Sequence, residues 1–331
     1  MTASRALRNT GRVSAETRER VLASARVVGY RPNPLVQTFM AGVRRQRVES
    51  TANLGWVTTE PKPKPAHKFI REGARDRAAE LGFGLEEILI STEQDAGSAE
   101  ARATKHGRIL RARGVVGAVI APLAEPGGID FPWSQMPVAA VGRSLLAPSL
   151  HYVMAHFYRM MDQIIAELLK RGYRRIAFLN TREMDARSEQ APLSRFSPHV
   201  AESRDDLMLT TTFCDDWEDD DFRALLKHTQ PDAVVGIYAQ MHEQLQRAGA
   251  RIPKKVGFVT LSWSEMHPHC AGIRHPWEAI GAGAVDMVVA QLHRNERGIP
   301  ARPKAMLFEG DWVEGNTLRP RLSSKAVTAT A

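Results

Sequence analysis

Short apolar runs alternate with amphipathic stretches through most of the chain. The runs, which we expect to be strands, lie at residues 54–57, 85–90, 115–121, 138–141, 175–179, 233–237 and 256–261. The amphipathic stretches predict helices at residues 67–82, 105–113, 158–171, 222–228 and 242–248. Strands that are apolar throughout and alternate with helices are typical of a mostly parallel sheet covered on both faces. These units are too many for one small sheet, so the pattern predicts two α/β lobes with clefts at the carboxyl ends of their strands.

The N-terminal region follows a helical pattern instead. Ser14 is a good N-cap for a helix in which apolar residues from Val21 to Val28 recur on one face, and Gly29 can end it. After a proline-rich turn, Asn33 can cap a second, short helix that runs to residue 42. That helix is too short to persist alone in water. It is either an ordinary linker or a segment that orders only on DNA, with its apolar side chains in the minor groove.

Positive charge is concentrated in the same region. Residues 1–50 contain ten Arg, no Lys and three Glu, a net charge of +7, whereas the whole chain carries +8. A basic arm on an almost neutral body indicates a polyanionic partner, most plausibly nucleic acid. A solvated basic tail is the alternative. The helix caps and the apolar periodicity favour the first interpretation.

The bulk composition is that of a soluble globular protein. The chain has 331 residues, enough for more than one packed unit, of which 43% are hydrophobic and 25% charged. No apolar stretch is long enough to cross a membrane, and the Arg-rich N-terminus lacks the apolar core of a secretory signal. Cys214 and Cys270 lie far apart and predict no disulfide framework. We therefore expect a cytoplasmic protein without a membrane partner.

Other candidate chemistry is weak. His267, His269 and Cys270 crowd within four residues without a second ligand pair, which favours a surface loop over a metal site. The acidic run at residues 215–221 lacks the glycine and terminal glutamate of a calcium loop and predicts a solvated loop and helix start. Residues 281–283, Gly-Ala-Gly, fit packing inside a helix. Phosphate-binding and catalytic motifs are absent, so we expect no enzyme, no metal and no cofactor.

Several residue types at fixed spacing carry a specific resemblance. The strongest stretches are residues 2–7 (TASRAL), 12–14 (RVS), 17–18 (TR) with Val21, and 29–33 (GYRPN). Weaker matches are Gly73, residues 168–177 (LLKRGYRRIA), residues 231–233 (PDA), Gly249 with Pro253, and residues 280–281 with Ala284. In these positions the chain resembles the lac repressor/galactose repressor (LacI/GalR) family of bacterial transcription regulators.

The resemblance implies a domain order. Residues 1–32 would form a partial all-α helix-turn-helix headpiece, and residues 33–50 a hinge helix and linker. Residues 51–320 would form a two-lobed α/β core like the type I periplasmic binding proteins, which binds an effector and dimerises. We expect the first lobe at residues 53–152 and 276–303, the second at residues 153–275 and 304–320, and a flexible tail at residues 321–331.

The resemblance also implies how DNA is bound. Residues 2–7 would be the end of the recognition helix, with Arg5 in a base-reading position where it can pair with guanine. Ser4, Ser14 and Tyr30 fall where family members contact phosphates. Phe39 takes the place of a leucine that wedges into the central base step. A palindromic operator bound by a homodimeric repressor is therefore expected. The full set of expected DNA-binding residues is Thr2, Ser4, Arg5, Arg12, Ser14, Tyr30, Asn33, Val36 and Phe39.

The N-terminus departs from the family pattern. The family motif begins with a helix and turn before the recognition helix, whereas Met1 here stands in the middle of that helix. Two explanations remain open. The natural protein is longer, which we favour because the remaining half keeps its caps and contact residues. Alternatively, the protein is shortened and acts as a cytoplasmic small-molecule-binding protein without autonomous DNA binding.

The family binds a small molecule, often a sugar, between its lobes. By position, Arg187 would donate hydrogen bonds to ligand hydroxyls or to a carboxylate. Tyr238 stands where family members usually have an Asn. Ser262 and Trp263 replace paired acidic residues, and His275 replaces a frequent Gln. Thr58 and Thr59 are candidates at the mouth of the cleft. The aromatic residues either stack on a carbohydrate or aromatic effector or simply fill the cleft.

Overall fold

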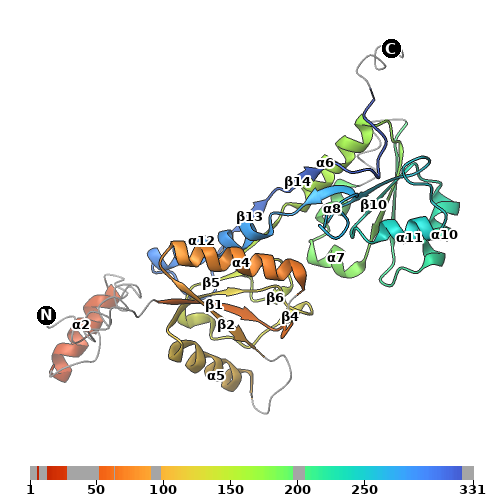
Figure 1. Cartoon of the computed structure of the whole chain (residues 1–331). Coiled ribbons are helices and arrows are strands. Elements are labelled where there is room, and N and C mark those ends of the chain that lie inside the picture. The colour runs from red at the N-terminus through yellow and green to blue at the C-terminus, as the bar shows by residue number, and fades with distance from the viewer. Residues whose placement is uncertain are drawn as a thin grey trace.

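Two α/β lobes joined end to end make up most of the protein (Figure 1). The computed structural model describes residues 6, 13–27, 52–62, 64–90, 98–196 and 206–322. Each lobe contains a six-stranded sheet, and a small two-stranded sheet pairs β4 (Gly127–Gly128) with β6 (Leu145–Ala147). The two-lobed α/β architecture predicted from the sequence is confirmed. Among the described residues, no helix combines the length and apolar character needed to span a membrane.

The first lobe has an all-parallel sheet in the order β13-β7-β5-β3-β1-β2. Its strands are β1 (Asn53–Thr58), β2 (Gly84–Leu89), β3 (Val115–Ile120), β5 (Val138–Val141), β7 (His151–Ala155) and β13 (Ala305–Phe308). Helices α4 (Pro65–Glu80) and α12 (Trp277–His293) cover one face, and α5 (Ala99–Ala112) covers the other (Figure 1). A short 3-10 turn, η1 (Trp133–Gln135), precedes β5.

The second lobe repeats this plan with one reversed edge strand. Its sheet has the order β14-β12-β11-β10-β8-β9, parallel except for β14. The strands are β8 (Arg175–Asn180), β9 (Met208–Phe213), β10 (Ala233–Gly236), β11 (Gly257–Thr260), β12 (Ala271–Arg274) and β14 (Asp311–Val313). The helices are α6 (Phe157–Lys170), α7 (Arg182–Arg187), α8 (Ala191–Arg195), α10 (Asp219–Thr229) and α11 (Met241–Arg247).

The chain passes between the lobes three times, after β7, after β12 and after β13. The N–H of His156 donates to the carbonyl of Phe308 (2.7 Å), so the first and third crossings lie side by side. The expected boundaries placed residues 153–155 and 304–308 in the second lobe. Strand pairing places them in the first, because β7 and β13 pair with each other in its sheet. The chain leaves a lobe only where a strand ends.

Most expected elements are found within a few residues of their predicted positions. The main difference is α5, which begins at Ala99 because Ser98 accepts the N–H of Ala101 (3.2 Å) and caps it. The acidic run starts α10 as expected, with Glu218 and Asp221 forming a capping box. Several elements were not predicted: the strands β4, β6, β7, β9 and β12 to β14, and the helices α7 and α8. The edge strand β13 is largely exposed, and β9, with three consecutive threonines, lacks a continuous apolar run.

Helix α2 (Ala15–Val27) begins where the sequence predicts. Ser14 Oγ accepts the N–H of Thr17 (3.3 Å), which is the contact expected of an N-cap. Ala6 is helical and buried. The other expected DNA-binding residues, the Gly29 cap, the hinge helix and most of the tail lie outside the described residues.

Helices α4 and α12 touch backbone to backbone. A Cβ atom added to Gly281 would lie 1.8 Å from the carbonyl oxygen of Ile70, and one added to Gly73 would lie 2.0 Å from that of Glu278. Arg77 and Asp286 join the same helices by an ion pair of 2.7 Å. The prediction that residues 281–283 serve helix packing is confirmed.

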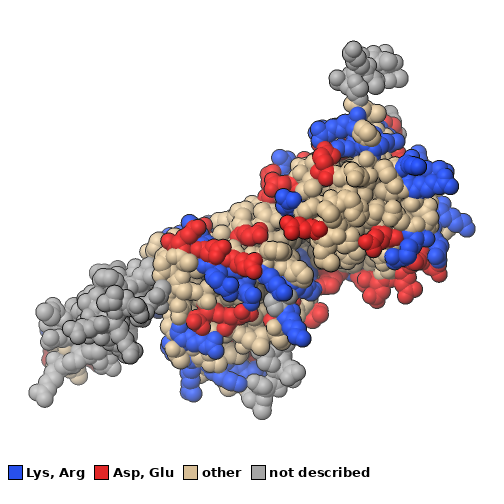
Figure 2. Space-filling view, viewed as in Figure 1, with Lys and Arg blue, Asp and Glu red and all other residues tan. Residues whose placement is uncertain are grey.

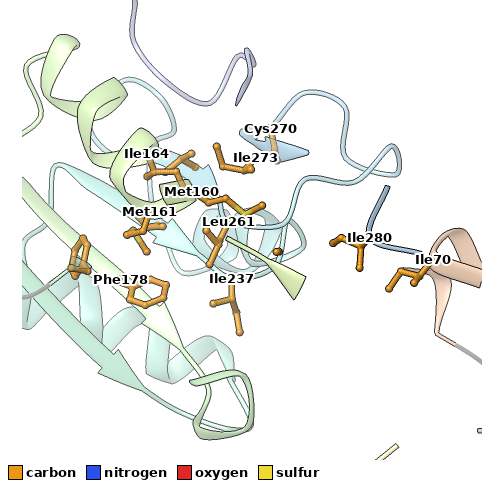
Figure 3. Close-up of a cluster of buried hydrophobic side chains, with 14 of the residues drawn as sticks. Ile70, Met160, Met161, Ile164, Phe178, Ile237, Leu261, Cys270, Ile273 and Ile280 are labelled. Carbon is orange, nitrogen blue, oxygen red and sulfur yellow. The ribbon is translucent and has the colours of Figure 1, made fainter. Parts of the chain in front are cut away.

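The apolar core continues from one lobe into the other. Figure 3 shows Met160, Ile164 and Ile273 together in the second lobe, with Ile70 and Ile280 as a separate pair in the first. Ile237 and Leu261 lie beside the second-lobe group (Figure 3). These last two side chains belong to the wall of the cleft described next.

Candidate functional site

A cavity of about 230 Å³ lies between the lobes. Its walls include Val141 and Ala155 at the ends of β5 and β7, and Asn180, Ile237 and Leu261 at or just beyond the ends of β8, β10 and β11. Both sheets therefore point the carboxyl ends of their strands at the cavity, as expected for open α/β sheets. Its lining is mainly apolar with a few polar groups, which is typical of a small-molecule site.

Four of the expected effector residues line this cavity. They are Arg187 on α7, Tyr238 after β10, Ser262 after β11 and His275 at the crossing after β12. They are separated in sequence and meet only because parallel strands bring their following loops to one edge. Their role in binding a ligand remains a prediction.

The other three expected residues do not line the cavity. Thr58 is buried, and its hydroxyl accepts the N–H of Glu60 (3.0 Å). The hydroxyl of Thr59 accepts the N–H of Ala124 (3.3 Å). The ring of Trp263 lies 4.5 Å from the guanidinium of Arg274. Trp263 faces β12 because its backbone N–H pairs with the carbonyl of Ile273 (2.8 Å), which turns the chain that way.

Arg187 joins the two lobes. Its Nη1 and Nη2 donate to the carbonyls of Leu123 (3.1 Å) and Ala124 (2.6 Å) in the first lobe, and its Nε donates to Glu183 (2.7 Å) on its own helix. A second link pairs Arg143 of the first lobe with Glu189 of the second (2.7 Å). In this conformation the guanidinium of Arg187 stabilises the lobe arrangement through backbone carbonyls.

Replacing Arg187 with alanine is expected to favour a more open arrangement of the lobes. Two charged hydrogen bonds between lobes are lost, each worth about 1.5 kcal/mol or more, so the open form should gain at least about tenfold in population. Small-angle X-ray scattering should report a larger radius of gyration. Arg182→Ala is the matched control, because Arg182 lies on the same helix and packs on Phe213 within the second lobe. An unchanged radius for Arg187→Ala would contradict this role.

His275 and Trp277 form a flat aromatic surface in the cavity wall. Their rings stack 4.4 Å apart with 5° between the planes, and Phe157 lies against the imidazole at 5.7 Å. His275 Nε2 lies 2.9 Å from the carbonyl of Leu261, and since a carbonyl only accepts, this nitrogen carries the proton. Nδ1 is then an acceptor, and it is buried without a hydrogen-bond partner among the described residues. Burial lowers the pKa of His275 to about 4, so the ring is neutral at neutral pH.

Sequence reasoning missed several polar and aromatic groups of the cavity. Asn180, Glu183, Arg143 and Trp277 all line it. Asn180 donates to Asp185 (3.2 Å), and burial raises the pKa of that carboxyl. Asn180 stands at the end of a predicted strand, which is the signal that would have suggested it. The partly buried phenol of Tyr238 also has a raised pKa, chiefly because of burial.

The comparison with known families separates two regions. Residues 1–33 match the family described as bacterial regulatory proteins, lacI family. Residues 165–317 match the periplasmic binding protein-like domain. These two matches occur in the order expected of the LacI family. The family resemblance drawn from the sequence is thereby confirmed.

Individual relatives agree with this assignment. The HTH-type transcriptional regulator AscG of Escherichia coli (strain K12) is 28% identical over 205 residues, which are 61% of this chain and 57% of AscG. The match thus spans little more than half of that relative. The lac repressor dimer bound to operator and the anti-inducer ONPF has a TM-score of 0.60 at 21% identity, over 96% of this chain and 95% of the repressor. The transcriptional regulator CelR–cellobiose complex has a TM-score of 0.59 at 20% identity, over 95% and 94% of the two chains. At these identities the two structures support the fold.

Proposed function

We propose that this protein is a sequence-specific DNA-binding transcription regulator of the LacI family, a repressor that acts as a homodimer on a palindromic operator. A small-molecule effector in the cleft between the lobes would control it. One observation carries the proposal: a ligand-sized cavity has walls from both lobes, in a chain whose first 33 residues match the family's DNA-binding headpiece.

The distribution of charge supports separate roles for residues 1–50, which would bind DNA, and for the two lobes, which would bind the effector. On the face seen in Figure 2, Lys and Arg are interspersed with Asp and Glu over both lobes, without a large field of one sign. The net charge of +7 in residues 1–50 is therefore the natural source of phosphate contacts. This segment joins the core at β1, in the first lobe.

The cavity suits a ligand with hydroxyl groups and an apolar face. The stacked rings of His275 and Trp277 offer a platform, and Tyr238 offers a second aromatic side chain. Nδ1 of His275 can accept a hydrogen bond from a ligand hydroxyl, and the guanidinium groups can donate hydrogen bonds. A carbohydrate-like effector meets these requirements. By binding one lobe arrangement more tightly, it would shift the population of the DNA-binding form.

Gel-shift titration on the protein's own promoter region tests the proposal. We expect binding that weakens steeply as salt rises, because phosphate contacts release counterions. Phe39→Ala should weaken specific binding about tenfold and leave non-specific binding unchanged, and Arg5→Ala should relax base preference by about 1–3 kcal/mol at one position. The control Arg223→Ala removes an exposed charge on α10 and should bind as the wild type does.

Two results would count against the proposal. Absence of salt-sensitive binding would exclude operator recognition by this chain. If Phe39→Ala binds specific DNA and non-specific DNA with the same affinities as the wild type does, the minor-groove wedge is excluded. A sugar screen on the DNA complex then tests control, since a true effector must change the operator affinity.

A further inference from the structure

Three metal-ligating side chains meet on the second lobe, outside the cleft. His242 Nδ1 lies 3.2 Å from His269 Nε2, and with Cys270 Sγ all three atoms lie within 4.8 Å of one another. His242 belongs to α11, whereas His269 and Cys270 end the loop before β12. The sequence alone argued against a metal here because no second ligand group was evident. The fold supplies one from 27 residues earlier in the chain.

The separations are close to those of a tetrahedral zinc site. With Zn–N bonds of about 2.1 Å and tetrahedral angles, two nitrogen ligands stand about 3.4 Å apart. The two imidazole nitrogens already have nearly this separation. A Zn–S bond of about 2.3 Å places the sulfur about 3.6 Å from each nitrogen, so the sulfur must approach the nitrogens by at most about 1.2 Å. That movement is within reach of a side-chain rotation.

A fourth ligand is available beside these three. The ring of His267 lies 6.3 Å from that of His269, and its Nδ1 is buried without a hydrogen-bond partner among the described residues. Its other nitrogen lies 3.6 Å from a carboxylate oxygen of Glu243, the residue after His242. A ring shift of His267 or a water molecule would complete four-coordination. Glu243 can hold the second nitrogen of His267, as carboxylates do for ligating histidines.

We propose that His242, His269 and Cys270 bind a zinc ion, with His267 or water as the fourth ligand. Two imidazoles and a thiolate select a borderline or soft divalent ion such as Zn²⁺ and disfavour Mg²⁺ or Ca²⁺, which prefer oxygen ligands. The alternative is a plain hydrogen bond between two histidines beside a buried cysteine. That arrangement needs no metal and binds none with a defined stoichiometry.

Metal binding would join α11 to the loop between β11 and β12. The same loop begins with Leu261 and Ser262 in the cleft wall, and α11 follows Tyr238. Zinc is therefore expected to stiffen one side of the cleft and to raise thermal stability. The rise in thermal stability can be measured without an assay of DNA binding or effector binding.

The test uses the full chain without a histidine tag, stripped with a chelator and dialysed. Titration with Zn²⁺ against a chromophoric chelator should give one ion per chain. Titration with Co²⁺ should give the intense visible bands of tetrahedral cobalt together with a thiolate charge-transfer band in the near ultraviolet. The cobalt spectrum reports sulfur ligation in the wild type, so this readout does not depend on a cysteine variant that folds.

Variants assign the ligands. His269→Gln changes an exposed residue and should lower zinc affinity at least tenfold, and Cys270→Ser should abolish the charge-transfer band. His228→Gln, on the exposed surface of α10, and Cys214→Ser are the matched controls and should bind as the wild type does. Binding below one ion per chain, or full affinity in His269→Gln, would overturn the proposal. A cobalt complex without the thiolate band would exclude Cys270 as a ligand and overturn it as stated.

Discussion

Gly281→Ala should destabilise the first lobe by about 2–4 kcal/mol, even though alanine is the better helix former. The helical preference of alanine over glycine is worth about 1 kcal/mol in favour of the variant. Against this, the new Cβ would lie 1.8 Å from the carbonyl oxygen of Ile70, where no side chain can rotate away. Helix α12 must then move away from α4 and from the sheet that both helices cover. The steric destabilisation caused by overpacking against the backbone exceeds the stabilisation from the higher helix propensity of alanine.

Hydrogen exchange can localise this effect. Amides of α4 and α12 should exchange faster in Gly281→Ala, while those of β8 and β10 in the second lobe should change less. Gly127→Ala is the matched control, because a Cβ at Gly127 meets no atom closer than 4.0 Å and its backbone is not left-handed. Equal unfolding free energies for Gly281→Ala and Gly127→Ala would show that the two helices can separate without cost.

Acid should destabilise the wild type more than His275→Gln. The pKa of His275 is about 4 in the folded protein, against 6.5 for an ordinary histidine. Between these values the unfolded chain binds a proton that the folded chain does not, so stability is lost as the pH falls through this window. The difference between the two pKa values corresponds to about 3 kcal/mol. Glutamine cannot take up this proton, yet it retains an N–H donor for the Leu261 carbonyl.

Urea unfolding at neutral pH and at about pH 4.5 measures this linkage. The stability advantage of the wild type over His275→Gln should shrink by up to about 3 kcal/mol over that range. Carboxylates and other histidines affect both proteins alike and cancel in the difference. His228→Gln replaces an exposed histidine on α10 and is the matched control for the substitution. A constant difference for His275→Gln would mean that the imidazole has the same pKa in the folded and unfolded chains, which would contradict the lowered pKa of the folded protein.

The fold class, the family resemblance and most of the secondary-structure elements could be predicted from the sequence. Strands such as β3 and β10 are apolar at almost every position because both faces are covered, and that pattern is visible without a structure. Helix starts are equally local: Ser14 caps α2 through a residue three positions away. The arm's positive charge and its spaced motifs are also properties of neighbouring residues. Interactions of short range in sequence can be recognised from sequence.

Contacts between residues that are distant in sequence could be identified only from the tertiary structure. The lobe boundaries at residues 155 and 308 follow from β7 pairing with β13, about 150 residues apart, and neither strand alone indicates this pairing. Trp263 was expected in the cleft, yet it faces β12, where its backbone N–H pairs with the carbonyl of Ile273. Trp277, which stacks on His275, supplies the aromatic surface of the cleft instead. The direction of a side chain in a loop depends on such contacts.

The histidine and cysteine cluster shows the same limit. His269 and Cys270 alone resemble an ordinary surface loop, and nothing near His242 in the sequence points to them. Packing of α11 against β11, seen in the ring contact of His242 with Phe258 at 5.6 Å, brings the third side chain within ligand distance. A site assembled from separate elements exists only once the elements have packed, and for that reason sequence spacing could not reveal it.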